Sequence, residues 1–263
     1  MTISLHESFA RAKTENRALL IGYMPAGFPT LEKSISLIAA MIKGGVDVIE
    51  VGFPYSDPVM DGPVIQQAAE VALKNGTSAS DVFKVVSTAT VPTLVMSYWN
   101  PIEKYGAEQF AAALEKNGGV GVITPDLTVE ESANWISVTD KNKIGRVYVV
   151  APSSKDERLK KVSTACSGFV YAASLMGVTG ARNVVSNAAE SLVERVRNYT
   201  SLPVAVGLGV STREQAAQVA QYADGVIVGS AFIKLVLEAR DHETALLQVE
   251  SLASELAKGV RKL

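Results

Sequence analysis

The sequence has few of the residues that disulfide, metal or imidazole chemistry needs. It contains one cysteine, Cys166, and two histidines, His6 and His242, in 263 residues. A single cysteine forms no disulfide within the chain, and Cys166 lacks the neighbours of a metal site. Both histidines fall in the predicted first and last helices rather than at strand ends, which argues against an imidazole base. We therefore expect no metal and no cofactor in this chain.

Long apolar runs and concentrations of one charge are also missing. Lys and Arg (25) nearly balance Asp and Glu (27), the formal net charge is −2, and no basic run occurs. Nucleic acid and anionic membrane are therefore disfavoured as main partners. No apolar stretch is long enough to cross a bilayer, and residues 1–13 lack the apolar core of a signal peptide. These features predict a cytoplasmic protein.

Short apolar segments, in contrast, are abundant. Hydrophobic residues make up 48% of the chain and charged residues 20%, which is enough for a large core. Eight segments rich in Val and Ile predict strands at 18–23, 46–51, 91–98, 120–124, 147–150, 168–174, 203–207 and 226–228. Helical patterns predict helices at 30–43, 64–74, 78–88, 106–116, 130–140, 155–162, 187–198, 213–222 and 243–260. Leu5, Phe9 and Ala12 predict a further short amphipathic helix before the first strand.

This order of elements predicts the fold class α/β, as a TIM (β/α)8 barrel with an extra N-terminal helix. Residues 1–263 show no linker or break in composition, so we expect a single domain. The strands lack polar alternation, which is typical of strands covered on both sides. The alternative is a doubly wound open sheet, but no G-x-G-x-x-G follows the first strand. In a barrel, the active site lies at the C-terminal ends of the strands.

The stretch Ile49–Gln66 concentrates carboxylates at such a strand end. Glu50 lies in the second predicted strand, and Asp57 and Asp61 lie in the loop that follows, which Gly and Pro keep irregular. A buried Glu50 with a raised pKa would suit proton transfer. The alternative is that the two aspartates cap turns and that Glu50 pairs with a lysine. The spacing alone leaves both interpretations open.

Glycine-rich segments follow the last three predicted strands, at 177–180, 207–211 and 229–230. Glycines let backbone N–H groups approach an anion, and barrels often bind phosphate through the last two loops. The segment 176–186 is long, small and polar, and we interpret it as either a lid or a passive surface loop. No lysine lies at a strand end, since Lys234 follows the last strand by a helical turn, and this weakens a Schiff-base aldolase.

Five segments together resemble the tryptophan synthase alpha subunit family, in the same order and over essentially the whole chain. They are 50–66, 125–127, 177–182, 207–211 and 229–231. The resemblance implies a TIM-barrel lyase that cleaves indole-3-glycerol phosphate to indole and glyceraldehyde 3-phosphate in tryptophan biosynthesis. It also implies a complex with a pyridoxal-phosphate (PLP)-dependent beta subunit, as an α2β2 tetramer, in which the indole is joined to serine.

The resemblance also assigns residues. It implies that Glu50 is the proton shuttle, that Asp61 accepts a hydrogen bond from the indole N–H, and that Tyr171 is a further catalytic residue. It implies that the substrate phosphate is bound by Gly180, Gly209, Gly229 and Ser230. It places Thr179 and Tyr23 at the lid and indole pocket. The implied partner interface consists of Asp57, Asn100 and Asp126. Departures from the family pattern occur at Met60, Leu208 and Thr128.

Two other functions stay open at this level. One is a catalytically weak barrel whose main role is to bind and activate the beta subunit. The other is a different enzyme of phosphorylated sugars, an isomerase or an aldolase. Protection from unfolding by indole-3-glycerol phosphate distinguishes the last of these.

Overall fold

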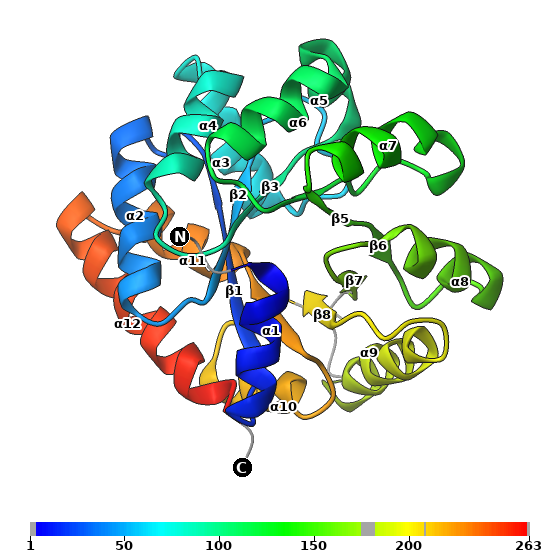
Figure 1. Cartoon of the computed structure of the whole chain (residues 1–263). Helices are drawn as coiled ribbons and strands as arrows, with labels where there is room; N and C mark the ends of the chain where they lie inside the picture. Colours follow the sequence, from blue (N-terminus) through cyan, green and yellow to red (C-terminus); the bar gives the residue numbers. More distant parts are fainter. Residues whose placement is uncertain (1–3, 175–181, 208, 262–263) are drawn as a thin grey trace.

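The computed structural model describes residues 4–174, 182–207 and 209–261. Its strands are β1 (Leu19–Pro25), β2 (Val48–Gly52), β3 (Thr93–Met96), β4 (Gly121–Ile123), β5 (Gly145–Val147), β6 (Val149–Val150), β7 (Val170–Ala173), β8 (Val204–Gly207) and β9 (Gly225–Val228). Its helices are α1 (Leu5–Thr14), α2 (Leu31–Lys43), α3 (Pro63–Lys74), α4 (Ala79–Thr88), α5 (Trp99–Tyr105), α6 (Ala107–Lys116), η1 (Val129–Glu131), α7 (Ala133–Lys141), α8 (Asp156–Ala165), α9 (Arg182–Arg197), α10 (Arg213–Ala220), α11 (Ser230–Glu238) and α12 (His242–Gly259). The helices surround the strands (Figure 1).

The sheet closes on itself. All pairings within it are parallel, and the strand order is β5-β4-β3-β2-β1-β9-β8-β7-β6. The two strands at the ends of this order, β5 and β6, are consecutive in the chain and are separated only by Tyr148. Because they are two parts of one strand, the sheet is an eight-stranded barrel without open edges. The predicted TIM barrel is confirmed, and the open doubly wound sheet is wrong.

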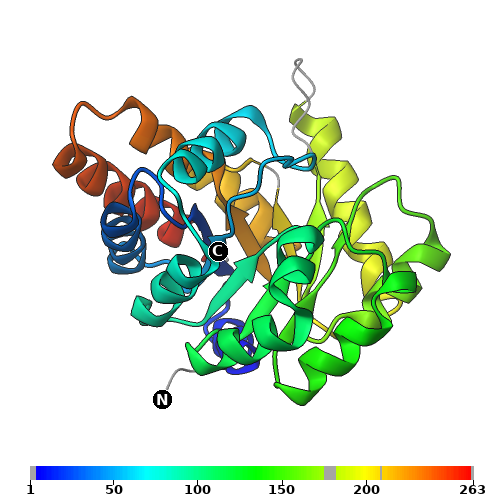
Figure 2. The same ribbon diagram turned by 90° about the horizontal axis from the view of Figure 1, so that it is seen from above.

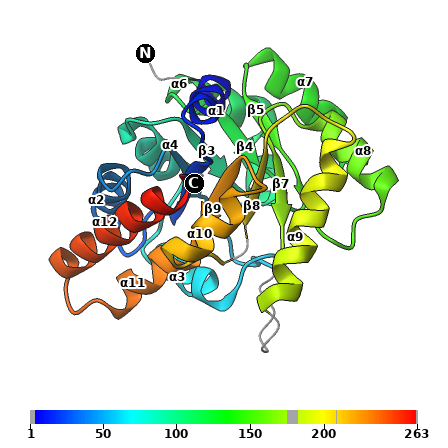
Figure 3. The same ribbon diagram turned by 90° about the horizontal axis from the view of Figure 1, so that it is seen from below.

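Side chains from alternate strand positions fill the inside of the barrel, as the two-residue period of a strand requires. This inner cluster consists of Leu5, Phe9, Ala12, Leu19, Ile21, Val48, Leu94, Ile123, Val147, Phe169, Ala205 and Ile227. The first three belong to α1, which closes the end of the barrel where the strands begin. In Figures 2 and 3, α1 and α3 lie at opposite ends of the barrel. The extra N-terminal helix is thus confirmed, and the other end is left for a site.

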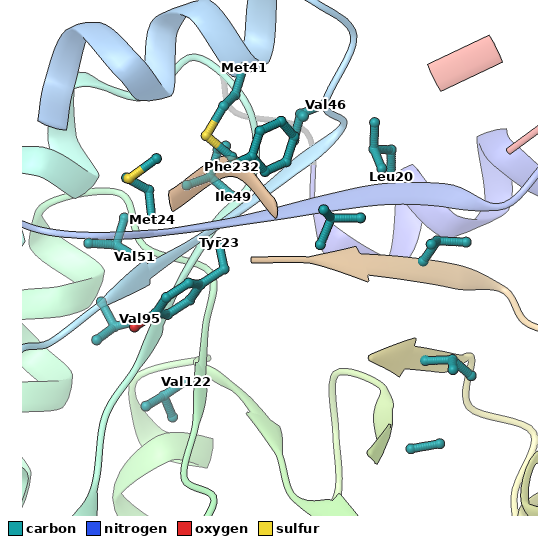
Figure 4. Packing of buried hydrophobic residues seen from close by; sticks show 14 of the residues in the cluster. Leu20, Tyr23, Met24, Met41, Val46, Ile49, Val51, Val95, Val122 and Phe232 are labelled. Atoms are coloured by element: carbon teal, nitrogen blue, oxygen red, sulfur yellow. The ribbon is translucent and has the colours of Figure 1, made fainter. Parts of the chain in front are cut away.

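A second apolar cluster lies between the barrel wall and the helices. Figure 4 shows Met24 of β1 on the same side as Met41 of α2 and Val46, whereas Tyr23 points to the opposite side of the strand. A Cβ at Gly22 would collide with the Met41 side chain and lie 3.1 Å from Val46. The tight packing of α2 against one face of β1 therefore leaves Tyr23 directed into the barrel.

Local sequence signals set most helix starts. The predicted cap of α2 is present, since the Thr30 hydroxyl accepts from the Lys33 N–H at 3.3 Å. Pro63 is the first residue of α3, where its missing N–H costs no hydrogen bond. α1 begins with a reciprocal pair, in which Ser4 and Glu7 each accept from the other's backbone N–H.

Three predictions need correction. The helix α5 lies between a predicted strand and a predicted helix and was not predicted; its Pro101 is in the first turn, where a proline interrupts no intrahelical bond. The fifth strand is interrupted at Tyr148 rather than continuous over 147–150. α9 begins at Arg182, so residues 182–186 of the predicted loop at 176–186 are helical instead. Residues 176–181 of that loop lie outside the described part of the chain.

In the described part of the chain, no helix is long and apolar enough to span a membrane.

Candidate active site

Glu50 is the buried carboxyl at the centre of the open end of the barrel. It follows Val48 by two positions on β2, so it faces inward above the inner cluster, between Tyr23 of β1 and Leu94 of β3 in the sheet register. It is 1% exposed, and burial raises its pKa to about 8. Within the described residues, Oε1 of Glu50 has no hydrogen-bond partner. Pairing with a lysine is therefore wrong, and a carboxyl protonated at neutral pH is a candidate general acid.

The raised pKa predicts an effect on stability that needs no activity. Between the unfolded value near 4.5 and the folded value of about 8, folded Glu50 keeps a proton that the unfolded chain releases. Stability must then fall as pH rises through this window, by about 1.4 kcal/mol per pH unit. We expect the difference in the free energy of unfolding, Glu50→Gln minus parent, to increase steadily from pH 5 to pH 7.5.

Urea unfolding of both proteins across this range measures the difference, because titrations shared by both proteins cancel. Glu108→Gln, on the exposed face of α6, is the matched control and should show a constant difference from the parent. A constant difference for Glu50→Gln as well would mean that Glu50 does not retain its proton on folding.

Asp61 is held beside the same space by its loop and by α5. Its backbone N–H donates to Pro58 O at 3.0 Å, and Gln66 of α3 donates to its carbonyl at 2.9 Å. The Tyr98 hydroxyl donates to Oδ2 of Asp61 at 3.1 Å. Burial raises the pKa of Asp61 to about 6, against the effect of the Tyr98 hydrogen bond. Asp61 is thus mostly ionised at neutral pH and able to accept hydrogen bonds, which a simple turn cap does not explain.

A cavity of about 200 Å³ lies between these carboxyl groups and the last loops of the barrel. Seven residues that were assigned by the resemblance line it, and they are Tyr23, Glu50, Asp61, Tyr171, Gly209, Gly229 and Ser230. Its apolar lining includes Ile65, Met96 and Val149. Two further assigned residues, Thr179 and Gly180, lie outside the described part of the chain. The structure therefore gathers the predicted site residues that it describes around one cavity, apart from those assigned to a partner.

Tyr23 of β1 and Tyr171 of β7 line the cavity together with Glu50 and Asp61. Burial raises the pKa of both hydroxyls well above the ordinary value, and the nearby charges of Glu50 and Asp61 add to this. Both hydroxyls therefore remain protonated donors. Their close approach to the barrel wall depends on Gly52 and Gly207, since a Cβ at either position would collide with the hydroxyl of Tyr23 or Tyr171 respectively.

The glycine-rich end of the cavity is formed by the loops after β8 and β9. Gly209 has a left-handed backbone with φ +74°, which favours glycine. Gly229 caps α11, and Ser230 is the first residue of that helix. The first N–H groups of a helix have no intrahelical partner and favour an anion. This end of the cavity is therefore suited to a phosphate.

The three residues assigned to a partner interface lie outside the cavity, on the loops after β2, β3 and β4. Asp57, Asn100 and Asp126 are all exposed. Asp126 accepts from the Trp99 N–H at 2.9 and 3.1 Å and so caps α5, on which Asn100 lies. Contact of these residues with a partner stays a prediction.

Two supporting residues were missed at the level of sequence. Tyr98 follows β3 and contacts Asp61, and Gln66 holds the Asp61 carbonyl. The position of Tyr98 just past a strand end was a signal that could have identified it. Among the departures from the family pattern, Met60 lines the cavity and donates its N–H to the Tyr98 hydroxyl at 2.9 Å. The Thr128 hydroxyl donates to Glu131 at 3.0 Å, and Leu208 lies outside the described residues.

Comparison with known proteins gives one consistent result. The family model described as Tryptophan synthase alpha chain matches residues 9–261. The tryptophan synthase alpha chain of Thermobifida fusca is 58% identical, with 99% of this chain and 98% of the relative covered. That of Streptomyces avermitilis is 56% identical, with 98% and 94% covered.

Solved structures agree. A structure of Mycobacterium tuberculosis tryptophan synthase matches with a TM-score of 0.91 at 46% identity, covering 99% of both chains. A structure of tryptophan synthase subunit alpha from Legionella pneumophila matches with a TM-score of 0.88 at 32% identity, covering 97% of both chains.

The barrel and its cavity define a TIM-barrel enzyme in which the carboxyl groups of Glu50 and Asp61 line a cavity at the C-terminal end of the strands. The family match then specifies which enzyme of this class it is: the chain belongs to the tryptophan synthase alpha chain family. It is the lyase subunit that cleaves indole-3-glycerol phosphate to indole and glyceraldehyde 3-phosphate, and it works with a beta subunit. The alternative that the chain is a different enzyme of phosphorylated sugars, an isomerase or an aldolase, is therefore wrong.

Proposed function

We propose that Glu50 and Asp61 carry out the cleavage with opposite protonation states. The single observation that supports this most is that Glu50 is buried, has an unpartnered Oε1 and lines the same cavity as Asp61. With a pKa of about 8, Glu50 holds a proton at neutral pH, whereas Asp61, with a pKa of about 6, has mostly lost its own. Two carboxyls whose environments separate their pKa values are a basis for assigning acid and base roles.

In the proposed mechanism, Glu50 donates a proton and regains one, while Asp61 stays ionised. Glu50 first donates its proton to C3 of the indole, which makes the ring an indolenine cation. The carboxylate of Asp61 accepts a hydrogen bond from the indole N–H and stabilises this charge. Glu50, now ionised, takes the proton of the adjacent glycerol hydroxyl. The C–C bond breaks as the aldehyde forms, its electron pair returns to the indole, and Glu50 is again protonated.

Tyr171 and Tyr23 are proposed to complete the pocket. Their protonated hydroxyls and rings lie beside the two carboxyls, and the apolar side chains of Ile65, Met96 and Val149 suit a flat aromatic ring. We propose that Gly209, Gly229 and Ser230, together with Gly180, bind the substrate phosphate through backbone N–H groups. Thr179 is proposed to belong to the lid, as the resemblance implies.

Gly229 offers a test of phosphate binding. Its φ of −126° is negative, so Gly229→Val brings no left-handed strain. The added Cβ would lie 3.2 Å from the Tyr23 ring and would crowd the start of α11. We expect KM for indole-3-glycerol phosphate to rise about 10-fold or more, with a smaller fall in kcat, because access to the N–H groups is blocked.

Calorimetric titration with glycerol 3-phosphate measures the same effect without chemistry. Ser251→Val, at an exposed position of α12, is the control for a new β-branched residue elsewhere. Unchanged affinity of a folded Gly229→Val would remove phosphate binding from this loop.

We also propose the finer arrangement of the complex. Residues 1–263 act as a single barrel domain without a cofactor of their own, and the PLP is held by the beta subunit. The partner docks on Asp57, Asn100 and Asp126, forms an α2β2 tetramer and receives the indole, and the complex works in the cytoplasm. Exposed apolar side chains on the Asp61 loop support this docking, since Val59 is 79% exposed and Met60 56% exposed.

The experiment that tests the proposal is indole release from indole-3-glycerol phosphate, measured for the chain alone and with a beta subunit. Cleavage that depends on Glu50 and Asp61 supports it. Parent-like cleavage after the loss of either carboxyl would remove that residue from the proposed mechanism.

A further inference from the structure

The loop that carries Asp61 contacts the N-terminus of α5 at both of its ends. At the far end, the Tyr98 hydroxyl donates to Asp61 and accepts from the Met60 N–H, at 3.1 and 2.9 Å. At the near end, the Tyr55 hydroxyl accepts from Nδ2 of Asn100 at 2.9 Å. The loop is therefore attached to the start of one short helix at Tyr55 and again at Met60 and Asp61.

Aromatic packing connects these two attachments. The rings of Tyr55 and Tyr98 lie 5.3 Å apart, with an interplanar angle of 32°. Tyr98 is buried, at 4% exposure, whereas Tyr55 is half-buried and Asn100 is exposed. A substitution at the surface residue Asn100 can thus affect the position of Asp61 through the rings of Tyr55 and Tyr98.

The helix itself has a fixed start. Tyr98 is the N-cap residue of α5, and the next N–H, that of Trp99, donates to both carboxylate oxygens of Asp126. Since this cap fixes the start of α5 to the loop after β4, Tyr98 and Asn100 form a stable base for the contact with the Asp61 loop. The Asp61 loop is the part that such a base would hold in position.

We infer that Tyr55, Tyr98 and Asn100 form a clasp that positions the carboxylate of Asp61 for the reaction. Tyr98 is the positioning residue that touches Asp61, Tyr55 transmits the position of the loop, and Asn100 fixes Tyr55 from the surface. The inference rests on the proposed role of Asp61, and it predicts that the exposed residue Asn100 affects the reaction through Tyr55.

Asn100→Ala and Tyr55→Phe each remove one partner of the outer hydrogen bond and retain the ring packing. Each variant should lower kcat for indole release about 5-fold, as expected for loss of one ordinary hydrogen bond, with KM changed less than about 2-fold. The double variant should be no slower than either single one, because both substitutions remove the same interaction. Tyr105→Phe is the matched control, since Tyr105 lies on α5 but packs against Phe83 and Phe110.

Hydrogen exchange separates this inference from the proposed function. In the isolated chain, the peptide that contains Met60 and Asp61 should exchange faster in Asn100→Ala and Tyr55→Phe, and unchanged in Tyr105→Phe. If the parent releases no indole, the proposed function fails while the exchange result still judges the clasp. Parent-like exchange and parent-like kcat in both variants, or fully additive losses in the double variant, would overturn the clasp.

Discussion

Replacing Glu50 by glutamine should lower kcat for indole release by more than about 10²-fold, the loss expected when a general acid–base group is removed. Glutamine keeps the size of the side chain and can still donate a hydrogen bond, but it transfers no proton. Because position 50 is only 1% exposed, bulk water has little access to take over the proton transfer in the variant. Substrate binding should be largely intact, because neither the phosphate loops nor the apolar lining changes.

Single-turnover indole release, together with the dissociation constant for glycerol 3-phosphate, measures both quantities. Glu108→Gln, on the outer face of α6, controls for the loss of one carboxyl charge. Near-normal release by Glu50→Gln would assign Glu50 a structural role and leave the proton transfer to another group.

The second large effect concerns the partner. We expect a beta subunit to raise the cleavage rate of this chain by at least about 10-fold, equivalent to a coupling energy of about 1.4 kcal/mol. The reason is the position of Asp61, which lies on a loop with two neighbours, Val59 and Met60, that are mostly exposed in the chain alone. A partner that covers this loop would hold the carboxylate in place before the charge on the indole develops.

Asp57→Ala tests where that partner acts. Asp57 is exposed, and among the described residues its side chain bonds only with the adjacent Ser56 hydroxyl, so the loss of its carboxylate should leave the activity of the isolated chain unchanged. It should shift half-maximal activation to a higher beta-subunit concentration, whereas Glu194→Ala, exposed on α9, should not. An isolated chain that already cleaves at the rate of the complex would refute the predicted coupling.

Local sequence patterns determined the number and order of the barrel strands and the positions of most helices. Runs of Val and Ile indicated buried parallel strands, and signals such as Thr30 and Pro63 located helix starts to within a residue. They did not indicate the short helix α5, in whose first turn Pro101 is harmless, or the interruption of the fifth strand at Tyr148.

The residue types of the site were also visible in the sequence. Glu50 and Asp61 stood at a strand end and in its loop, and the resemblance gave them roles. Their protonation was not visible, because a pKa depends on burial and on neighbours that are distant in the chain. Closure of the barrel removed water from Glu50 and raised its pKa to about 8. Folding also brought Tyr98, which follows β3, into contact with Asp61.

The sequence by itself therefore determined the fold and the chemical groups, because strand period, glycine and proline act over a few residues. Only the tertiary structure decided which carboxyl holds a proton and what positions the other. Both depend on residues from different strands that share one small space, and such distances are set only when the barrel closes.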